Sequence, residues 1–249
     1  MSRNGPSFYD DPEVFATYMK RRERRDSPND TLESPVVKEL LGNPSGLAFL
    51  DLGCGDARFG KELLAAGAVS YTGVDGSSKM VEAARAQLAG SSGIAVHCPL
   101  ESLSLPDSTF DRACSRLALH YVEDVARVIS IVSKSLKLGG LFVFSVEHPV
   151  ITSSSAAATE SGLRQDWIVD DYFIEGPRVT TWMGSRVVKY HRTVADYFAA
   201  VVGAGLHVES LCESNPDRDQ FEDEALFRRR QRIPLFLLIA ARKHASADV

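Results

Sequence analysis

The amino-acid sequence predicts an α/β fold, a doubly wound sheet of seven strands that run mostly parallel, with helices on both faces. Two observations carry this prediction. Between about Ser45 and Val150, short runs of apolar and β-branched residues alternate with stretches of helical periodicity, as βαβ units require. Beyond Val150 an irregular stretch follows, and two further strand-like runs near the C-terminus complete the sheet.

The alternating region is expected to supply five strands, whose apolar content is typical of strands covered on both faces. These strands are expected at residues 47–52, 69–75, 94–98, 110–115 and 141–146. The helices between them are expected at residues 57–66, 78–89 and 122–138. Gly139 and Gly140 would end the last helix as a left-handed C-cap. Ser34 and Pro35 are typical of an N-cap and first turn, and open a further short helix through Leu41.

The rhythm of the sequence changes after Val150. Residues 151–161 are rich in Ser, Thr and Ala, lack a core-forming period, and predict a loop or mobile lid. Residues 178–183 and 186–191 flank Gly184-Ser185, which predicts a β-hairpin with a two-residue turn.

The last part of the chain returns to the α/β pattern. Thr193 and Asp196 predict the start of a helix that reaches about Ala204. The two closing strands are expected at residues 206–211 and 234–241.

Composition narrows the classes of function. The net charge of −5 at pH 7 gives no overall attraction for a polyanion, so nucleic acid is not expected as the main partner. The basic runs at residues 20–25 and 228–232 are interpreted as solvated helix faces. No pattern in the sequence indicates an oligomeric state.

The cysteines and the apolar runs bear on metal binding and location. Four cysteines lie far apart without a Cys-x-x-Cys pair, which argues against a zinc site or a disulfide framework, and no metal is expected. The N-terminus lacks the apolar core of a signal peptide, and the longest apolar run, residues 233–241, is too short to span a bilayer. A cytoplasmic protein without membrane association is the expectation.

The strongest motif lies at residues 49–60, FLDLGCGDARFG. A strand ends at Asp51-Leu52 and turns through Gly53, Cys54 and Gly55, where glycine lets the backbone approach a ligand closely. A dinucleotide fingerprint needs a third glycine at the position that Arg58 occupies, so a nicotinamide-dependent oxidoreductase is disfavoured.

The Asp51-x-Gly-x-Gly pattern resembles the first motif of class I S-adenosylmethionine-dependent methyltransferases, in which the acidic residue lies beside the methionine amino group. The resemblance covers about residues 48–149 and is closest to small-molecule enzymes of the ubiquinone-biosynthesis-like, methyltransferase type 11 group. It implies a Rossmann-like fold of the class I type, S-adenosyl-L-methionine as cofactor and S-adenosyl-L-homocysteine as product. Asp75 at the end of the second strand would then accept hydrogen bonds from the ribose hydroxyls, although such a carboxylate alone does not separate this cofactor from NAD.

The resemblance also implies further cofactor contacts. Met80 would pack on the adenine, unless it is a core methionine, and Glu101 would accept from the adenine amino group. Tyr18 and Arg22 resemble a Tyr-x-x-x-Arg pattern whose arginine contacts the cofactor carboxylate, and a solvated basic helix is the competing interpretation. The cofactor-binding residues implied by the resemblance are Tyr18, Arg22, Asp51, Gly53, Cys54, Gly55, Asp75, Gly76, Met80, Leu100, Glu101, Ser115 and Leu117, with Arg116 beside them.

Residues that follow the fourth and fifth strands are candidates for acceptor chemistry. Methyl transfer is an in-line displacement, so positioning is the main requirement, and a general base would add roughly 10² to 10⁴-fold in rate. His120 and His148 are expected at the carboxyl ends of strands, where ligands bind in open parallel sheets. The resemblance implies that His120 and Tyr121 lie nearer the acceptor. His191 is a fourth candidate. Each histidine has a hydrogen-bonded structural role as its alternative.

The chain is expected to divide at about residue 45. Residues 1–44 would form a helical segment that covers the cofactor site, and residues 45–249 the catalytic domain. Within that domain, residues 150–192 would be a lid and acceptor-site insertion after the fifth strand. Its aromatic candidates for acceptor binding are Trp167, Tyr172, Trp182 and Tyr190, unless they form the private core of a small subdomain.

The predicted activity is methyl transfer to an O, N or C centre of a small, planar or apolar molecule. Two alternatives stay open. The basic runs would suit an RNA or protein methyltransferase, although residues 115–118 (SRLA) stand where many such enzymes carry Asn-Pro-Pro-Tyr. A protein that binds the cofactor without transferring its methyl group is the other alternative.

Overall fold

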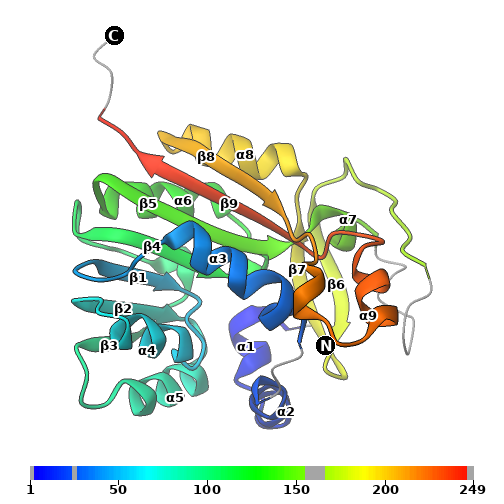
Figure 1. Ribbon diagram of the computed structural model, residues 1–249, viewed down its shortest axis with the longest axis horizontal. Coiled ribbons are helices and arrows are strands. Elements are labelled where there is room, and N and C mark those ends of the chain that lie inside the picture. Colours follow the sequence, from blue (N-terminus) through cyan, green and yellow to red (C-terminus); the bar gives the residue numbers. More distant parts are fainter. Residues whose placement is uncertain (1–2, 24–26, 155–165, 246–249) are drawn as a thin grey trace.

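Parallel strands make up most of the central sheet of this computed structural model, which describes residues 3–23, 27–154 and 166–245. The sheet strands are β1 (Ala48–Leu52), β2 (Ser70–Asp75), β3 (Gly93–His97), β4 (Phe110–Arg116), β5 (Leu136–Glu147), β8 (Leu206–Glu213) and β9 (Phe236–Lys243). Their order is β3-β2-β1-β4-β5-β9-β8, and β9 runs antiparallel to both neighbours (Figure 1). The predicted seven-stranded, mostly parallel sheet is confirmed. Because the order reverses between β1 and β4, a crevice forms at their carboxyl ends.

Helices cover both faces of the sheet. The helices of the described residues are α1 (Gly5–Tyr9), α2 (Pro12–Arg22), α3 (Ser34–Leu41), α4 (Arg58–Ala65), α5 (Ser78–Leu88), α6 (Val125–Ser135), α7 (Pro149–Thr152), α8 (Val194–Gly203) and α9 (Glu224–Arg230), with the π-helix η1 (Asn29–Glu33) and the 3₁₀ turns η2 (Leu100–Ser102), η3 (Leu119–Tyr121) and η5 (Arg218–Gln220). One buried cluster joins α3, α4 and α5 to the sheet, and a second joins α6 and α8 to its other face. This two-sided burial accounts for the apolar character of the strands.

The helix predicted at residues 122–138 is too long at both ends. α6 begins after Asp124, whose side chain accepts a hydrogen bond from the Arg127 amide at 3.0 Å and caps the helix. It ends at Ser135, because Leu136 already pairs with Phe110 of β4. Sheet pairing therefore ends this helix, and Gly139, although left-handed at φ 75°, lies within β5.

A separate hairpin follows the fifth strand. It consists of β6 (Gly176–Trp182) and β7 (Ser185–His191), and Trp182 pairs directly with Ser185. The turn is therefore Met183-Gly184, one residue earlier than predicted. Both turn residues have positive φ, 48° and 79°, as in the tight turns that match the twist of a hairpin.

The stretch predicted as a loop or lid at residues 151–161 is only partly described. Ile151 and Thr152 form the end of α7 instead, because His148 caps that helix by accepting from the Val150 amide at 3.2 Å. Residues 155–161 of this prediction lie outside the described residues.

The N-terminal segment lies against two distant parts of the chain. The Arg3 carbonyl accepts from the Val188 amide of β7 at 2.9 Å. Asp10 accepts from the Ser77 and Ser78 hydroxyls at 2.8 and 3.1 Å and from the Lys79 amide at 3.1 Å, at the start of α5. In Figure 1, α1 and α2 accordingly lie beyond the carboxyl ends of β1 and β2, on the side of the hairpin.

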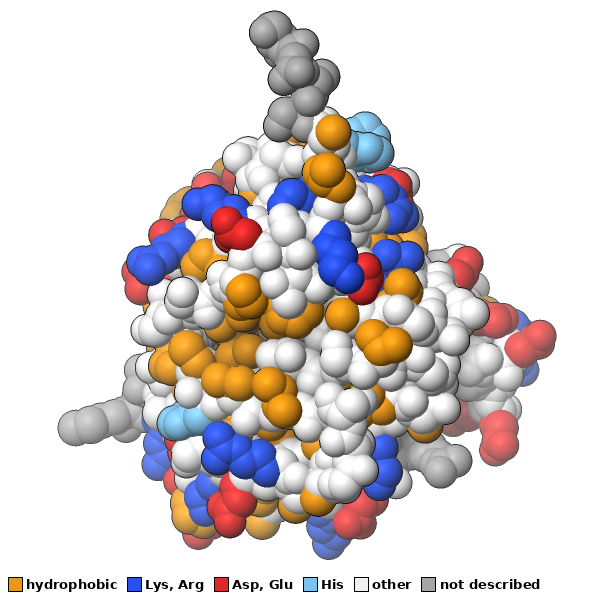
Figure 2. Space-filling model, turned by 90° about the vertical axis from the view of Figure 1, so that its left-hand side faces the viewer, with side chains coloured by type: hydrophobic (Ala, Val, Ile, Leu, Met, Phe, Trp, Pro, Cys, Tyr) orange, Lys and Arg blue, Asp and Glu red, His pale blue; other side chains and the backbone are white. Residues whose placement is uncertain are grey.

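The face at the left of Figure 1 is turned towards the viewer in Figure 2. There, among the described residues, Lys and Arg side chains are interspersed with Asp and Glu around a band of hydrophobic side chains, with no large area of one charge sign. In the described ranges of the chain, none of the helices is long and apolar enough to cross a membrane.

Candidate functional site

Two glycines shape the turn that follows β1. Gly53 and Gly55 have φ values of 73° and 55°, a backbone region that glycine enters without steric cost. A Cβ atom on Gly53 would lie 2.2 Å from the Cβ of Ala118, so the turn passes the residues after β4 closely. The Gly53 and Cys54 amides donate to the Val74 carbonyl at 2.7 and 3.1 Å. These contacts fix the turn between the carboxyl ends of three neighbouring strands.

A cavity of about 390 Å³ opens at this turn. Its walls come from the carboxyl ends of β1, β2, β4 and β5, from α1, α2 and η1, and from β6. Most of the residues predicted for the site line it: Tyr18, Arg22, Asp51, Gly53, Cys54, Gly55, Asp75, Gly76, Met80, Leu100, Glu101, Arg116, Leu117, His120, Tyr121 and Trp182.

Other lining residues were not predicted from the sequence. They are Gly5, Pro6, Tyr9, Arg21, Ser27, Pro28, Asn29, Glu33, Asp56, Phe59, Ala118, Val122, Glu147, Ile151, Leu235 and Phe236. Most belong to segments without a motif, and only the tertiary fold brings them together. Glu147 is different, because it directly precedes His148 at the carboxyl end of a predicted strand, and that position was a usable signal.

Asp51 is a buried carboxylate with one unsatisfied oxygen. Its Oδ2 atom accepts a hydrogen bond from the Tyr71 hydroxyl at 2.7 Å. Its Oδ1 atom is buried and has no hydrogen-bond partner among the described residues. Burial raises the pKa of Asp51 to about 6, although the Tyr71 hydrogen bond and the charge of Arg116 act to lower it.

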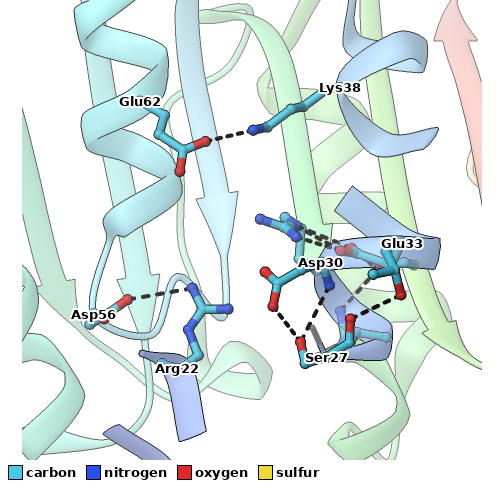
Figure 3. A network of polar contacts seen from close by, with 11 residues as sticks. Arg22, Ser27, Asp30, Glu33, Lys38, Asp56 and Glu62 are labelled. Atoms are coloured by element: carbon cyan, nitrogen blue, oxygen red, sulfur yellow. Dashed lines mark hydrogen bonds and ion pairs between the residues drawn. The ribbon is translucent and has the colours of Figure 1, made fainter. Parts of the chain in front are cut away.

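Arg22 faces the same cavity from α2. Its guanidinium lies 3.9 Å from a carboxylate oxygen of Asp56, and Figure 3 shows the two side chains pointing toward each other. The Arg22 Nε atom is buried and has no hydrogen-bond partner among the described residues. A buried donor and a buried acceptor, on Arg22 and Asp51, therefore lack partners in one cavity, which is the pattern expected of a ligand site.

A buried ion pair also supports the cavity wall. Glu33 of η1 is fully buried and binds the Arg116 guanidinium through both carboxylate oxygens, and it also accepts from the Ser145 hydroxyl at 2.7 Å. Figure 3 shows Glu33 beside Ser27 and Asp30 of the same segment. Arg116 also stacks on Phe59, 4.7 Å from the ring centroid. η1 is thereby attached to β4 and β5.

Asp75 at the end of β2 is held by two backbone amides. Its Oδ2 atom accepts from Gly55 at 2.9 Å and its Oδ1 atom from Ser77 at 2.8 Å. Burial raises the pKa of Asp75, and these hydrogen bonds oppose that rise. Beyond Asp75, the buried side chains of Met80 and Leu100 form an apolar wall.

Comparison with known proteins assigns the chain to a family. Residues 50–144 match the model of a methyltransferase domain. The crystal structure of an S-adenosylmethionine-dependent methyltransferase from Mesorhizobium loti is 36% identical, with a TM-score of 0.79 over 87% of this chain and 98% of that one. The chain belongs to the class I S-adenosylmethionine-dependent methyltransferase family. S-adenosylmethionine is the cofactor of this methyltransferase.

Two further comparisons extend over nearly the whole chain. An uncharacterized protein of Haemophilus influenzae is 32% identical over an alignment of 252 positions that covers 96% of this chain and 98% of that protein. Phosphoethanolamine N-methyltransferase 2 of Haemonchus contortus, in complex with S-adenosyl-L-methionine, shares the fold with a TM-score of 0.66 at 14% identity, over 96% of this chain and 60% of that one. The methyltransferase fold thus includes the segments outside residues 50–144.

The histidine that lines the methyltransferase cavity is buried and neutral. His120 lies in η3, and its Nδ1 atom accepts from the Glu147 amide at 3.4 Å. Burial lowers its pKa to about 3, against the charge of Glu147, which raises it. Next to it, the Tyr121 hydroxyl lies 3.4 Å from the Tyr9 hydroxyl of α1.

The two other histidines predicted for catalysis do not line the cavity. The His148 Nε2 atom donates to Glu213 at 2.9 Å, while Nδ1 caps α7. His191 is fully buried, with Nδ1 2.8 Å from the Thr152 hydroxyl and Nε2 2.9 Å from the Tyr172 carbonyl. These contacts are structural links between α7, the hairpin and the segment before it.

Ser115 is another predicted residue that does not line the methyltransferase cavity. It is fully buried in β4, and its hydroxyl donates to the Leu52 carbonyl of β1 at 2.9 Å. The side chain therefore braces two strands behind the glycine turn.

Among the four predicted acceptor-binding aromatics, Trp182 lines the cavity and three do not. Trp167 lies between two arginines of the α9 region, with their guanidinium carbons 5.1 and 5.2 Å from its ring. Tyr172 packs on His191 with ring centroids 5.7 Å apart. The Tyr190 hydroxyl donates to Glu123 at 3.3 Å. Across residues 3–23, 27–154 and 166–245, no group of three or more His, Cys, Asp or Glu side chains could bind a metal ion.

Proposed function

We propose that this methyltransferase transfers the methyl group of S-adenosylmethionine to a small molecule with a planar or apolar body. One observation carries the proposal. The part of the cavity wall that is not assigned to the cofactor includes three aromatic side chains from separate segments, Tyr9, Tyr121 and Trp182. Aromatic walls with a few polar groups are typical of small-molecule pockets.

The proposed placement of the cofactor begins at its methionine end. The orphaned Asp51 Oδ1 atom would accept from the ammonium group, and the orphaned Arg22 Nε atom would donate to the carboxylate. Both atoms are buried, so each would otherwise keep the full cost of desolvation. The bound methyl donor carries the reactive sulfonium, and these residues hold and orient it.

The adenosine end would lie along β2 and η2. Asp75, held rigid by the Gly55 and Ser77 amides, would accept from the ribose hydroxyls, since a carboxylate has room for more than two hydrogen bonds. Met80 and Leu100 would pack on the adenine ring, and Glu101 would accept from its amino group.

We further propose that residues 1–44 cover the cofactor and that residues 150–192 complete the acceptor pocket. Close contacts support the first part. A Cβ atom on Gly76 would lie 2.6 Å from Pro6, and a Cβ atom on Gly5 would lie 2.8 Å from Tyr121. Ile151 and Trp182 in the cavity wall support the second part.

A macromolecular acceptor has less support. The basic runs would be the feature that binds it, and in residues 228–232 two of the four arginines form ion pairs: Arg228 with Glu224 at 2.8 Å, and Arg232 with Asp166 at 3.3 Å. The Arg229 and Arg232 guanidiniums also stack on Trp167. This is how a partly paired surface helix is built, and it favours the small-molecule assignment.

The experiment is a methyl-transfer assay with labelled cofactor. The purified chain is incubated with S-adenosylmethionine carrying a labelled methyl group and with a cell extract separated into fractions below and above 3 kDa. Label in the low-mass fraction supports the proposal. Label only in RNA or protein supports a macromolecular acceptor, and calorimetric binding of the cofactor with no labelled product supports a non-methylating role.

A further inference from the structure

The acceptor end of the cavity contains an acid-base group that none of the predicted histidines supplies. Among the polar lining side chains that are not assigned to the cofactor, Glu33 and Asp56 are paired with Arg116 and Arg58, and Arg21, Ser27 and Asn29 belong to α2 and the segment around η1. The remaining four are Tyr9, His120, Tyr121 and Glu147. Burial raises the pKa of both tyrosines, so neither is a phenolate near neutral pH. The choice of a proton acceptor therefore lies between His120 and Glu147.

Hydrogen bonding excludes His120 from that role. A backbone amide can only donate, so the Glu147 amide fixes Nδ1 of His120 as the acceptor. In a neutral imidazole the other nitrogen then carries the proton. His120 consequently presents an Nε2–H donor, and its own acceptor nitrogen is already engaged.

Glu147 is paired with a buried lysine at the cavity wall. It ends β5, and its Oε1 atom accepts from Lys189 Nζ of β7 at 2.5 Å. Lys189 is 4% exposed, and Nζ lies 5.6 Å from the ring centroids of both Tyr121 and Trp182. An ammonium ion thus lies at the acceptor end, behind the carboxylate and beside two rings of the wall.

We propose that Glu147 is the general base for a neutral hydroxyl acceptor, such as a phenol, with Lys189 as its positioning residue; this inference rests on the proposed function. The hydroxyl O–H bond breaks and its proton goes to the Glu147 carboxylate. The oxygen lone pair forms the new O–CH₃ bond as the S–CH₃ bond breaks, and that electron pair returns to sulfur. Atoms and charges balance without a further reactant, and the product is a methyl ether.

The charge of Lys189 selects this acceptor class. A protonated amine would need the carboxylate-and-aromatic site that the Lys189 ammonium already occupies, and the two cations would repel each other. A hydroxyl group instead develops negative charge as it loses its proton, and a nearby ammonium stabilises that charge. His120 Nε2–H is a second donor on the same wall.

The first test joins product identity to one substitution. The labelled low-mass product is identified by mass spectrometry and by its stability to acid. A methyl ether is expected, and in Glu147→Gln its formation should fall by about 10² to 10⁴-fold, while S-adenosylhomocysteine affinity by calorimetry stays within about threefold. Glu82→Gln, an exposed glutamate on α5, is the matched control and should retain full activity.

The outcomes separate this inference from the proposed function. An N-methyl or C-methyl product, or a Glu147→Gln rate within a few-fold of wild type, overturns the inference and leaves methyl transfer intact. Absence of any product from a wild-type chain that binds S-adenosylhomocysteine overturns both. Loss of cofactor binding in Glu147→Gln also contradicts the inference, because the residue would then serve the cofactor.

Two readouts test the roles of Lys189 and His120 directly. In Lys189→Met the carboxylate loses its cation, so the acid limb of the pH–rate profile should move to higher pH, and Lys189→Arg should restore it. A fall in rate with no shift of the acid limb would mean that Lys189 has only a packing role.

Nitrogen-15 NMR of wild-type His120 should show the Nε2–H tautomer without titration down to pH 5. Titration of His120 near pH 6.5 would instead indicate that His120 is the general base.

Discussion

The buried carboxylate of Asp51 should make cofactor affinity depend on pH. If its charged form binds the cofactor ammonium, only the ionised fraction of the free protein is competent, and the apparent Kd rises as that fraction falls. With a pKa of about 6, S-adenosylhomocysteine affinity should be about twofold weaker at pH 6 than at pH 8, and about tenfold weaker at pH 5.

Stability should move in the opposite direction. Burial raises the pKa of Asp51 from 3.8 to about 6, so between these values the folded protein binds more protons than the unfolded chain. The contribution of this group to stability is therefore largest at low pH and is lost as pH rises toward 6, by on the order of 3 kcal/mol. A weaker affinity at pH 5 could then not be explained by unfolding, because protonation of Asp51 stabilises the folded protein.

Isothermal titration calorimetry with S-adenosylhomocysteine from pH 5 to 8 measures the effect. The control is Asp51→Asn, in which the affinity is lower throughout and the dependence is reduced to what Asp75, whose pKa burial also raises, contributes. A wild-type affinity that changes by less than twofold between pH 5 and pH 8 would refute the reasoning. An equally steep dependence in Asp51→Asn would refute the assignment to Asp51.

Two further pairs of substitutions, each with its control, test the packing of α4 and the binding of the cofactor. Gly60→Ala in α4 should destabilise the fold by about 1–3 kcal/mol in urea, because the new Cβ would lie 2.2 Å from the Tyr71 ring. Gly203→Ala in α8 meets nothing within 4 Å and should stabilise by about 0.5–1 kcal/mol; equal effects would contradict the packing argument. Arg22→Met should weaken S-adenosylhomocysteine binding at least tenfold in calorimetry through the lost charge-assisted bond, and Lys20→Met on the same helix should not.

The part of the cavity around the glycine turn, which we propose binds the cofactor, was predictable because its sequence signals are local. Asp51, the glycine turn and Asp75 follow strands whose pattern is plain in the sequence, and parallel strands bring their carboxyl ends to one edge. The seven-stranded sheet follows from the same pattern. Predicting these features requires only the order of the strands and helices along the chain, because a parallel sheet then brings the strand ends together.

Boundaries and turns were less predictable, because tertiary pairing competes with local propensity. Helical periodicity continues past Ser135, but pairing of Leu136 with Phe110 takes those residues into β5. The hairpin turn was displaced by one residue for a similar reason, since Met183 accepts a positive φ that sequence rules assign to glycine or asparagine.

The acceptor half could not be predicted residue by residue, because a histidine at a strand end has the same sequence signature whether it faces a ligand or holds the fold. His120 and His148 both follow strands, yet one lines the cavity while the other caps α7 and binds Glu213. The distinction depends on where β7 lies, since that strand brings Lys189 against Glu147. The proposed acceptor chemistry therefore depends on the β6–β7 hairpin that follows β5 in the chain, and exchanging that hairpin should change the acceptor while leaving cofactor binding intact.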